Sequence, residues 1–484
     1  MSRDANTKAS NRAAASPDVG TERARLRQEI LDKVAAYSRL VHRESPFVPG
    51  ETFVNYGGRV FDERELQSAV DAILDFWLTD GPRVETFTDQ LSGLLGLRHL
   101  LAVNSGSSAN LVAMTALCSR KLDDRPDRRR RLRPGDEVIT PAATFPTTVA
   151  PIVQNNLVPV FIDCNIGTYN IDVTLLEAGL SDRTRAVFVP HILGNPVEMD
   201  VVMDFAAAHD LYVIEDTCDA LGSTYDGRPC GTFGDFATFS FYPAHHITTG
   251  EGGAVGTNDG TLYHIAHAIR DWGRDCWCTH KSGQDGECGR RFDWEIPGLD
   301  EPYDHRYYFS EIGYNLKMTD VLAAIGIPQI AKLPDFVAVR KHNFQVLYDG
   351  LSAHQDFLVL PRWSPKADPA WFAFTLAVRE EAPFSRRELN EYLRERKVET
   401  RYLFAGNILQ QPGYRHIQHR VATPLIETDR VLRSAFFVGV YPGMDDARLD
   451  YMLQVFEDFI AERVRGGLAT SSRPGGNRAA GQVA

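Results

Sequence analysis

The stretch AVNSGSSANLVAMTAL, residues 102–117, combines an apolar strand, a turn of small residues and the start of an amphipathic helix. Backbone N–H groups at a helix start, with the hydroxyls of Ser105, Ser107 and Ser108 beside them, form a binding site for anions. A Ser-Gly turn also serves as a plain helix cap. The motif alone therefore leaves phosphate binding and capping both open.

Around this stretch, between about residues 102 and 257, apolar runs alternate with helical patterns such as the segment 200–210. The runs are continuously apolar, which predicts a largely parallel sheet covered on both faces. The predicted strands are DEVIT (136–140), LVPVFID (157–163), RAVFVPHIL (185–193), LYVIED (211–216) and FATFSFY (236–242). This alternation predicts an α/β layered domain.

The pattern changes to an α+β mixture after about Leu333, and a long helical pattern, ARLDYMLQVFEDFIAERV, follows near the end. We expect four parts. They are a disordered lead with an N-terminal helical segment (1–50), a large cofactor-binding α/β domain (51–333), a small C-terminal domain (334–465) and a disordered tail (466–484).

The composition narrows the class of partner. The 484 residues are 43% apolar and 24% charged, with a net charge of −12, which disfavours nucleic acid and anionic membranes. The basic run RRRRLRPGDE (128–137) contains Pro134 and Gly135, which favours a solvated loop over a phosphate-binding patch. No run reaches the roughly 18 apolar residues that span a bilayer, and the N-terminus lacks an apolar signal region. We expect a cytoplasmic protein, in which seven cysteines serve as thiols or ligands.

Two further motifs carry polar side chains to the ends of strands. VIEDTCDALGS (213–223) places Glu215 and Asp216 at the C-terminal end of a buried strand, where ligands of open α/β sheets bind. A carboxylate there keeps a ring nitrogen protonated in pyridoxal enzymes, or it caps a helix. ATFSFYPAHHITTGEGGAV (237–255) carries Ser240 to a strand end before a glycine-rich return.

These motifs in this order, with TPAATFPTT (140–148) between the first two, resemble the fold-type I pyridoxal enzymes, in particular the DegT-type sugar aminotransferase family. The resemblance extends from about Phe53 to Leu453. It implies a large domain with a mostly parallel central sheet and a smaller α+β C-terminal domain.

The resemblance also implies roles for single residues. Gly106, Ser107 and Ser240 would hold the phosphate of the cofactor. Phe145 would stack on the pyridine ring, and Asp216 would pair with the pyridinium nitrogen. The sequence thus carries the family's non-covalent contacts to the cofactor.

One position departs from the aminotransferase pattern. The family's lysine, which forms the Schiff base with pyridoxal phosphate (PLP), is replaced by His245, and imidazole cannot form that bond stably. Pyridoxamine phosphate (PMP) would still bind non-covalently, with His245 as a general base. Aminotransferases of the family often carry His or Gln at the position of Asp219, and His at the position of Tyr242. We therefore expect these two residues to contact the substrate or tune the site. A decayed site with a merely packed histidine is the alternative.

Enzymes of this family are dimers with shared sites, so Asn315, in GYNLKM, would reach the cofactor phosphate of the neighbouring subunit. The substitution pattern resembles the PMP-dependent sugar 3-dehydratases, a group of hydro-lyases. These expel the hydroxyl from sugar carbon 3 of a nucleotide-linked 4-keto-deoxyhexose. CDP-4-keto-6-deoxyglucose and dTDP-4-keto-2,6-dideoxyglucose, the latter on the route to antibiotic sugars, both fit. An aminotransferase with an atypical base and a non-catalytic sugar-nucleotide-binding protein are the rival interpretations.

Four cysteines, Cys218, Cys276, Cys278 and Cys288, form a set that suits a [2Fe–2S] cluster or tetrahedral zinc. The resemblance favours the cluster, because the family's iron–sulfur branch carries Cys-x57-Cys-x1-Cys-x7-Cys. Here the last interval holds nine residues, which puts Cys288 in doubt. A cluster implies that single electrons arrive from a separate NAD(P)H-dependent flavin or ferredoxin-type reductase, since no convincing dinucleotide motif is present.

Overall fold

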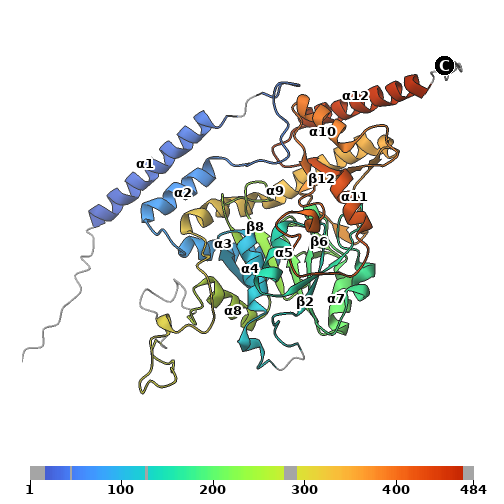
Figure 1. Ribbon diagram of the computed structural model, residues 1–484. Coiled ribbons are helices and arrows are strands. Elements are labelled where there is room, and N and C mark those ends of the chain that lie inside the picture. Colours follow the sequence, from blue (N-terminus) through green and yellow to red (C-terminus); the bar gives the residue numbers. More distant parts are fainter. Residues whose placement is uncertain (1–16, 44–45, 126–128, 277–290, 472–484) are drawn as a thin grey trace, which may run out of the picture.

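The computed structural model describes residues 17–43, 46–125, 129–276 and 291–471 (Figure 1). An eight-stranded sheet forms its centre. Strand β9 is antiparallel to both of its neighbours, and the other neighbouring pairs are parallel. In sheet order the strands are β1 (His99–Val103), β9 (Gly253–Thr257), β8 (Phe236–Ser240), β5 (Tyr212–Asp216), β4 (Thr184–Pro190), β2 (Glu137–Pro141), β3 (Val158–Ile162) and β14 (Arg420–Val421). The predicted strands and the mostly parallel sheet are confirmed.

Helices cover both faces of this sheet, because alternate apolar side chains of each strand point to opposite faces. On one face, Val138, Phe188 and Ile214 pack against α4 (Gly106–Ala116), α5 (Pro146–Gln154) and α8 (Gly260–Arg270). On the other, Val187 and Val213 pack against α6 (Leu176–Gly179) and α7 (Met199–Ala208). Helices α3 (Pro82–Leu95) and α9 (Asp320–Leu351) cover the β1–β9–β8 end. The layered α/β architecture follows from the continuously apolar strands.

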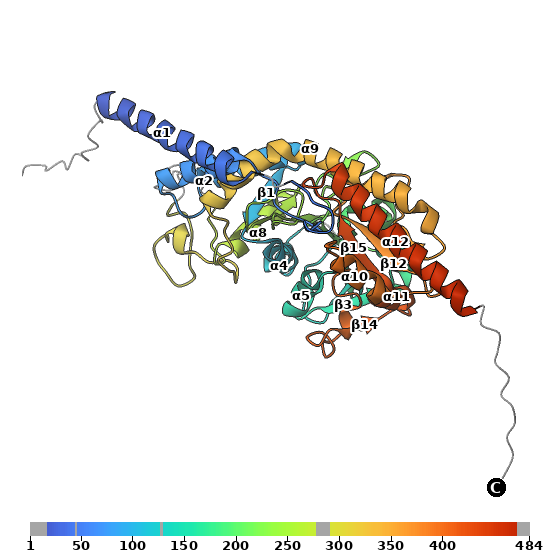
Figure 2. The ribbon, with the colours of Figure 1, turned by 90° about the horizontal axis from the view of Figure 1, so that it is seen from above.

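The C-terminal part builds a second, antiparallel sheet, ordered β10 (Leu358–Val359), β12 (Ala373–Val378), β15 (Ala435–Gly439) and β13 (Arg401–Tyr402). Helices α10 (Arg386–Glu395), α11 (Ile426–Ser434) and α12 (Asp446–Ser471) lie beside it (Figure 2). Strand β14 returns to pair with β3 of the large sheet, and α9 runs through the expected boundary at 333/334. The domain boundaries stay a prediction.

Short elements complete the fold. A three-stranded sheet contains β11 (Ala367–Asp368), β6 (Thr224–Tyr225) and β7 (Arg228–Pro229). The 3-10 helices are η1 (Arg120–Leu122), η2 (Val173–Leu175), η3 (Ile192–Gly194), η5 (His305–Tyr307), η6 (Ser352–His354) and η7 (Ile408–Gln410).

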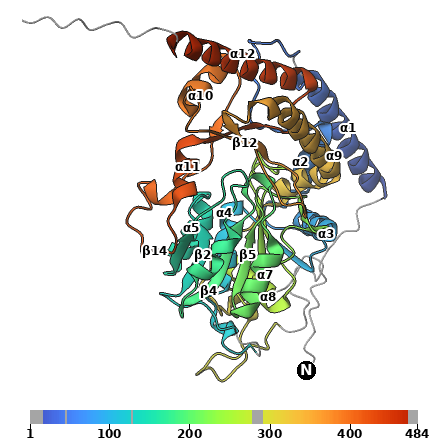
Figure 3. The ribbon, with the colours of Figure 1, turned by 90° about the vertical axis from the view of Figure 1, so that its right-hand side faces the viewer.

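The N-terminal helix α1 (Pro17–Val41) lies on the outside of the molecule against α2 (Glu63–Asp75), which in turn packs on α9 (Figure 3). Arg27 joins the first two helices through ion pairs to Asp71 and Asp75 of α2, at 2.5 and 2.6 Å. Helix α1 falls within the expected lead and helical segment (1–50), and residues 1–16 lie outside the described part of the chain.

Helix α9 is long and apolar enough, by length and composition alone, to cross a membrane; its mean hydropathy reaches 1.4 over 18 residues. Two of its polar side chains instead bind a carboxylate of α2. Lys332 pairs with Glu65 of α2 at 2.5 Å, and Gln329 donates to the same carboxylate at 2.7 Å. The helix packs against α2, α3 and α12. These contacts are those of a core helix.

Candidate functional site

A cavity of about 430 Å³ opens at the C-terminal ends of β5 and β8, beside the start of α4. This is the edge at which ligands of open α/β sheets bind. The structure brings nine of the predicted site residues together in its wall: Gly106, Ser107, Phe145, Asp216, Cys218, Asp219, Ser240, Tyr242 and His245.

The start of α4 forms one end of the cavity. Ser105 caps the helix, its Oγ accepting from Ser108 N at 3.1 Å. The first-turn N–H groups of Gly106 and Ser107 have no partner within the helix, and Ser240 lies against them. A Cβ on Gly106 would lie 2.5 Å from the Ser240 Cβ, so only glycine fits there. Backbone donors and hydroxyls thus form a cradle suited to a phosphate.

Asp216 ends β5 and presents a carboxylate that is 7% exposed. Its Oδ2 accepts from Asn110 Nδ2 at 2.9 Å and from Thr148 Oγ1 at 2.8 Å. These donors hold the carboxylate in one orientation at the cavity wall. An anionic group held in this way is what a protonated ring nitrogen requires as a partner.

The neighbouring carboxylate, Glu215, has a structural role. It is fully buried and accepts from the backbone N–H groups of Gly231, Phe233 and Gly234 at 2.7–2.8 Å. His191 Nε2, 3.2 Å away, completes the set. Of the two acidic residues that the strand brings to this edge, Asp216 faces the cavity and Glu215 holds the turn after β7.

Aromatic side chains form another part of the cavity wall. Phe145, at the start of α5, is 49% exposed, and its ring contacts Phe404 edge-on at 5.6 Å between centroids. An exposed ring at this point is free to stack on a planar ligand. Sequence reasoning missed Tyr56, His191, Phe372, Arg401, Tyr402, Phe404 and Phe437, which also line the cavity. They carry no local motif, since the fold brings them from distant parts of the chain.

His245 lies on the same wall with its side chain 16% exposed. Nδ1 lies 3.3 Å from Tyr242 O, and Nε2 lies 3.4 Å from Asp219 Oδ1. Both oxygens only accept, so a neutral ring donates to one of them at a time, and a ring that carries both hydrogens donates to both. Among the described residues that line the cavity, none is a lysine. The cradle, Asp216 and Phe145 therefore fit a phosphate-bearing pyridine cofactor, and the wall lacks the amine that would bind it covalently.

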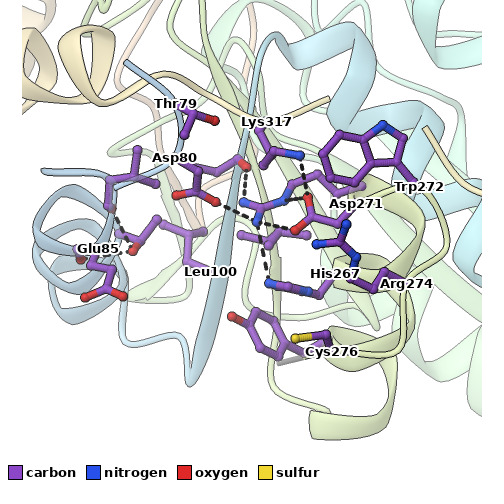
Figure 4. A pocket seen from close by; sticks show the side chains of 16 residues that line it. Thr79, Asp80, Glu85, Leu100, His267, Asp271, Trp272, Arg274, Cys276 and Lys317 are labelled. Atoms are coloured by element: carbon purple, nitrogen blue, oxygen red, sulfur yellow. Dashed lines mark hydrogen bonds and ion pairs between the residues drawn. The ribbon is translucent and has the colours of Figure 1, made fainter. Parts of the chain in front are cut away.

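The cysteine set is only partly described. Cys218 lines this cavity; burial, with Asp216 beside it, raises the pKa of its thiol well above the usual value. Cys276 lines a second cavity, of about 340 Å³, beside the buried Arg270 and its partners Asp80 and Asp271 (Figure 4). Cys278 and Cys288 lie outside the described residues. Within the described part, no three His, Cys, Asp or Glu side chains are placed to hold a metal ion.

Asn315 lies outside the cofactor cavity of its own chain. It is exposed, and its backbone pairs with Asp271, while the next residue, Leu316, accepts from Asn104 N at 2.8 Å. This places Asn315 near the turn that begins α4. Its reach to a neighbouring subunit stays a prediction.

Two known proteins are similar in sequence to most of this chain. The lipopolysaccharide biosynthesis protein RfbH of Salmonella typhimurium is 47% identical over 434 residues, covering 90% of this chain and 98% of that protein. The dTDP-4-dehydro-2,6-dideoxy-D-glucose 3-dehydratase of Saccharopolyspora spinosa is 45% identical, covering 89% and 92%.

A solved structure shows the same fold. The Escherichia coli GDP-4-keto-6-deoxy-D-mannose-3-dehydratase with bound hydrated PLP superimposes with a TM-score of 0.74 at 28% identity, covering 84% of this chain and all of that one. The model of the DegT/DnrJ/EryC1/StrS aminotransferase family matches residues 60–457. The chain belongs to the DegT/DnrJ/EryC1/StrS aminotransferase family.

Proposed function

We propose that this protein is a PMP-dependent 3-dehydratase of a nucleotide-activated 4-keto-deoxyhexose. The observation that carries the proposal is His245, which lines the cavity in the place of the lysine. The predicted contacts Gly106, Ser107, Phe145, Asp216 and Ser240 line the same cavity. Two relatives named 3-dehydratases, at 45% and 28% identity, support the same reaction.

The residues of this chain would divide the work. The start of α4 with Ser107 and Ser240 would hold the phosphate, Phe145 would cover the ring and Asp216 would keep its nitrogen protonated. Bound PMP would supply an amine that condenses with the sugar ketone and a ring that accepts electrons. These contacts orient the cofactor methylene without a covalent bond to the protein.

His245 would move the proton. With Nδ1 donating to Tyr242 O, Nε2 would be the basic nitrogen, and it would take a proton from the cofactor methylene. Asp219, 3.4 Å away, would stabilise the imidazolium that results. The apolar side chains of Phe372, Phe404 and Phe437 would shield this transfer from water.

The nucleotide is the open part of the substrate. CDP-4-keto-6-deoxyglucose and dTDP-4-keto-2,6-dideoxyglucose both fit the proposal, and the S. spinosa relative favours the second. Arg401 is the one permanently charged cation among the described cavity-lining residues, and we assign it to the sugar diphosphate. Its pairing with Glu399 at 2.5 Å holds it at the rim.

The proposal extends to the cysteines and to partners. Cys218, Cys276, Cys278 and Cys288 would bind a [2Fe–2S] cluster, supplied with electrons by a separate NAD(P)H-dependent flavin or ferredoxin-type reductase. The resemblance of the first two intervals to those of the family's iron–sulfur branch supports this assignment, while the last interval holds nine residues instead of seven. We also propose a cytoplasmic homodimer in which Asn315 contacts the cofactor phosphate of the second subunit.

The test is incubation of the PMP-loaded protein with each of the two nucleotide sugars, followed by mass spectrometry of the sugar. Loss of the 3-hydroxyl group from one of them supports the proposal. Transfer of nitrogen to the sugar from an amino acid donor would favour the aminotransferase interpretation, and absence of PMP affinity would favour the non-catalytic one.

A further inference from the structure

Helix α9 places a buried arginine directly behind the wall that carries His245. Arg340 is 1% exposed. Its Nη1 donates to Phe372 O at 3.0 Å and to Trp371 O at 3.3 Å, and its Nη2 donates to His245 O at 3.2 Å. The ring centroids of His245 and Phe372 lie 5.6 Å apart in the cofactor cavity, with the rings tilted by 55°. One guanidinium therefore fixes two wall segments that are distant in sequence.

The positive charge of Arg340 interacts with the carboxylate that contacts His245. Burial lowers the pKa of Arg340 to about 9, and the carboxylate of Asp219 opposes that shift. The Arg340 side chain is therefore a cation at neutral pH. Asp219, the carboxylate that attracts it, also lies beside His245. A lysine could not replace it fully, because an ammonium lacks the planar fork that reaches several carbonyls at once.

Two complementary polar atoms remain unpaired behind this contact. His246 is 2% exposed, and its Nε2 donates to Ala370 O at 3.0 Å, which leaves Nδ1 as an acceptor. Within the described part of the chain, neither His246 Nδ1 nor the Nε–H of Arg340 has a hydrogen-bond partner. One is an acceptor and the other is a donor.

Both side chains line the same small cavity, of about 10 Å³. That volume is of the order needed for one water molecule. The other polar side chains in its wall already have partners, since Gln329 donates to Val60 O and Glu65, and Thr248 donates to Phe241 O. A single water would accept from Arg340 and donate to His246, which satisfies both buried atoms.

We propose that Arg340 is a positioning residue for His245, and that one buried water molecule joins Arg340 Nε to His246 Nδ1. The proposal rests on the proposed role of His245 as the base. Arg340 touches neither substrate nor cofactor; it holds the peptide from which the imidazole projects. His246, the second histidine of the pair, would bind the water that contacts Arg340 and so support the position of His245.

A high-resolution crystal structure of the PMP-loaded protein tests the water directly. We expect one ordered water within hydrogen-bond distance of Arg340 Nε and His246 Nδ1. Density for an empty cavity, or for a water that contacts neither atom, would overturn this part of the proposal.

Two variants of His246 distinguish the roles of its two ring nitrogens. In His246→Gln the longer amide keeps a donor for Ala370 O and removes the acceptor at the Nδ1 position, whereas His246→Asn keeps an acceptor there. We expect the water to be lost in the first and kept in the second. A water retained at full occupancy in His246→Gln contradicts the proposal, and this test does not depend on activity.

The positioning role is measured with PMP deuterated at its methylene, as the rate of label loss in the presence of the nucleotide sugar. We expect Arg340→Lys to slow this rate about tenfold, because small displacements of a reacting group are costly. KM and the Kd for PMP should stay within about twofold, since the binding contacts are elsewhere. Lys341→Met, which removes the exposed cation next along α9, should exchange like the wild type.

The outcomes distinguish this inference from the proposed function. Normal exchange in Arg340→Lys, or a parallel loss of PMP binding, contradicts a positioning role. His245→Asn, measured alongside, tests the base itself. If that variant loses exchange while Arg340→Lys does not, only the present inference fails; if it exchanges normally, the proposed function fails.

Discussion

The Nε2 atom of His245 lies 3.4 Å from Oδ1 of Asp219, with both side chains 16% exposed at the wall of the cofactor cavity. The other ring nitrogen is engaged by Tyr242 O at 3.3 Å. The imidazole is thus held at both ends, with Nε2 beside a carboxylate. This arrangement suits a group that accepts a proton and must be stabilised once it is charged.

Replacing Asp219 by Asn should slow the reaction without weakening binding. The amide retains the shape of the carboxylate but not its charge, so the imidazolium loses its stabilising partner. We expect kcat to fall about 10- to 100-fold with KM within about threefold. Steady-state kinetics with a saturating reductase would check this, and an unchanged kcat would remove Asp219 from the account.

Replacing Arg401 by Gln should affect substrate binding. Arg401 is the cation that we assign to the sugar diphosphate, so its loss should raise KM about 10-fold with little change in the Kd for PMP. Arg387→Gln, which changes an exposed arginine on α10 that pairs with Glu391, is the matched control. Equal effects of the two substitutions would show that Arg401 does not contact the substrate.

The cysteine set makes a prediction about metal content. Anaerobically purified protein should contain two irons and two sulfides per chain, with thiolate-to-iron bands in the visible spectrum. Cys276→Ser should lose these bands and net 3-deoxygenation with reductase, yet keep reversible dehydration. Cys118→Ser, at the end of α4 and outside the set, should keep both. Iron-free protein after anaerobic reconstitution would contradict the cluster, and net turnover in Cys276→Ser would contradict the electron-relay role.

The buried His246 should make stability depend on pH. Burial, with the neighbouring charge of Arg340, lowers the pKa of His246 well below its usual value of about 6.5. The unfolded chain therefore binds a proton that the folded chain does not, and the free energy of unfolding should fall as the pH drops below about 6.5.

Chemical denaturation between pH 7 and pH 5 checks this effect. His246→Gln should show a shallower fall than the wild type, because glutamine does not titrate. His342→Gln, which changes an exposed histidine on α9, is the control and should follow the wild type. Parallel curves for all three proteins would show that His246 does not contribute.

The sequence predicts the large sheet and the part of the cavity wall at the strand ends because both depend on local patterns. Continuously apolar runs identify β2, β3, β4, β5 and β8, and the motifs that follow strand ends identify Ser107, Asp216 and Ser240. Glu215 and Asp216 are adjacent in a strand and point to opposite faces, so the pattern alone could not say which one faces the cavity.

The remaining part of the site depends on long-range packing. Phe372 and Arg401 reach the cavity from the C-terminal sheet, and Arg340 reaches the back of His245 from the middle of a 32-residue helix. None of these residues stands in a motif. Strand β14 likewise joins the large sheet from the C-terminal part, although only two residues of it pair with β3.

The most direct test of the account is the fate of the methylene protons of PMP in wild-type protein and in His245→Asn. With deuterated PMP and dTDP-4-keto-2,6-dideoxyglucose or CDP-4-keto-6-deoxyglucose, the wild type should lose one deuteron to solvent and release the sugar's 3-hydroxyl. His245→Asn should bind PMP with similar affinity and retain the label, with exchange slowed by a factor of about 100 or more. Wild-type exchange in His245→Asn would contradict the central claim that this histidine is the base.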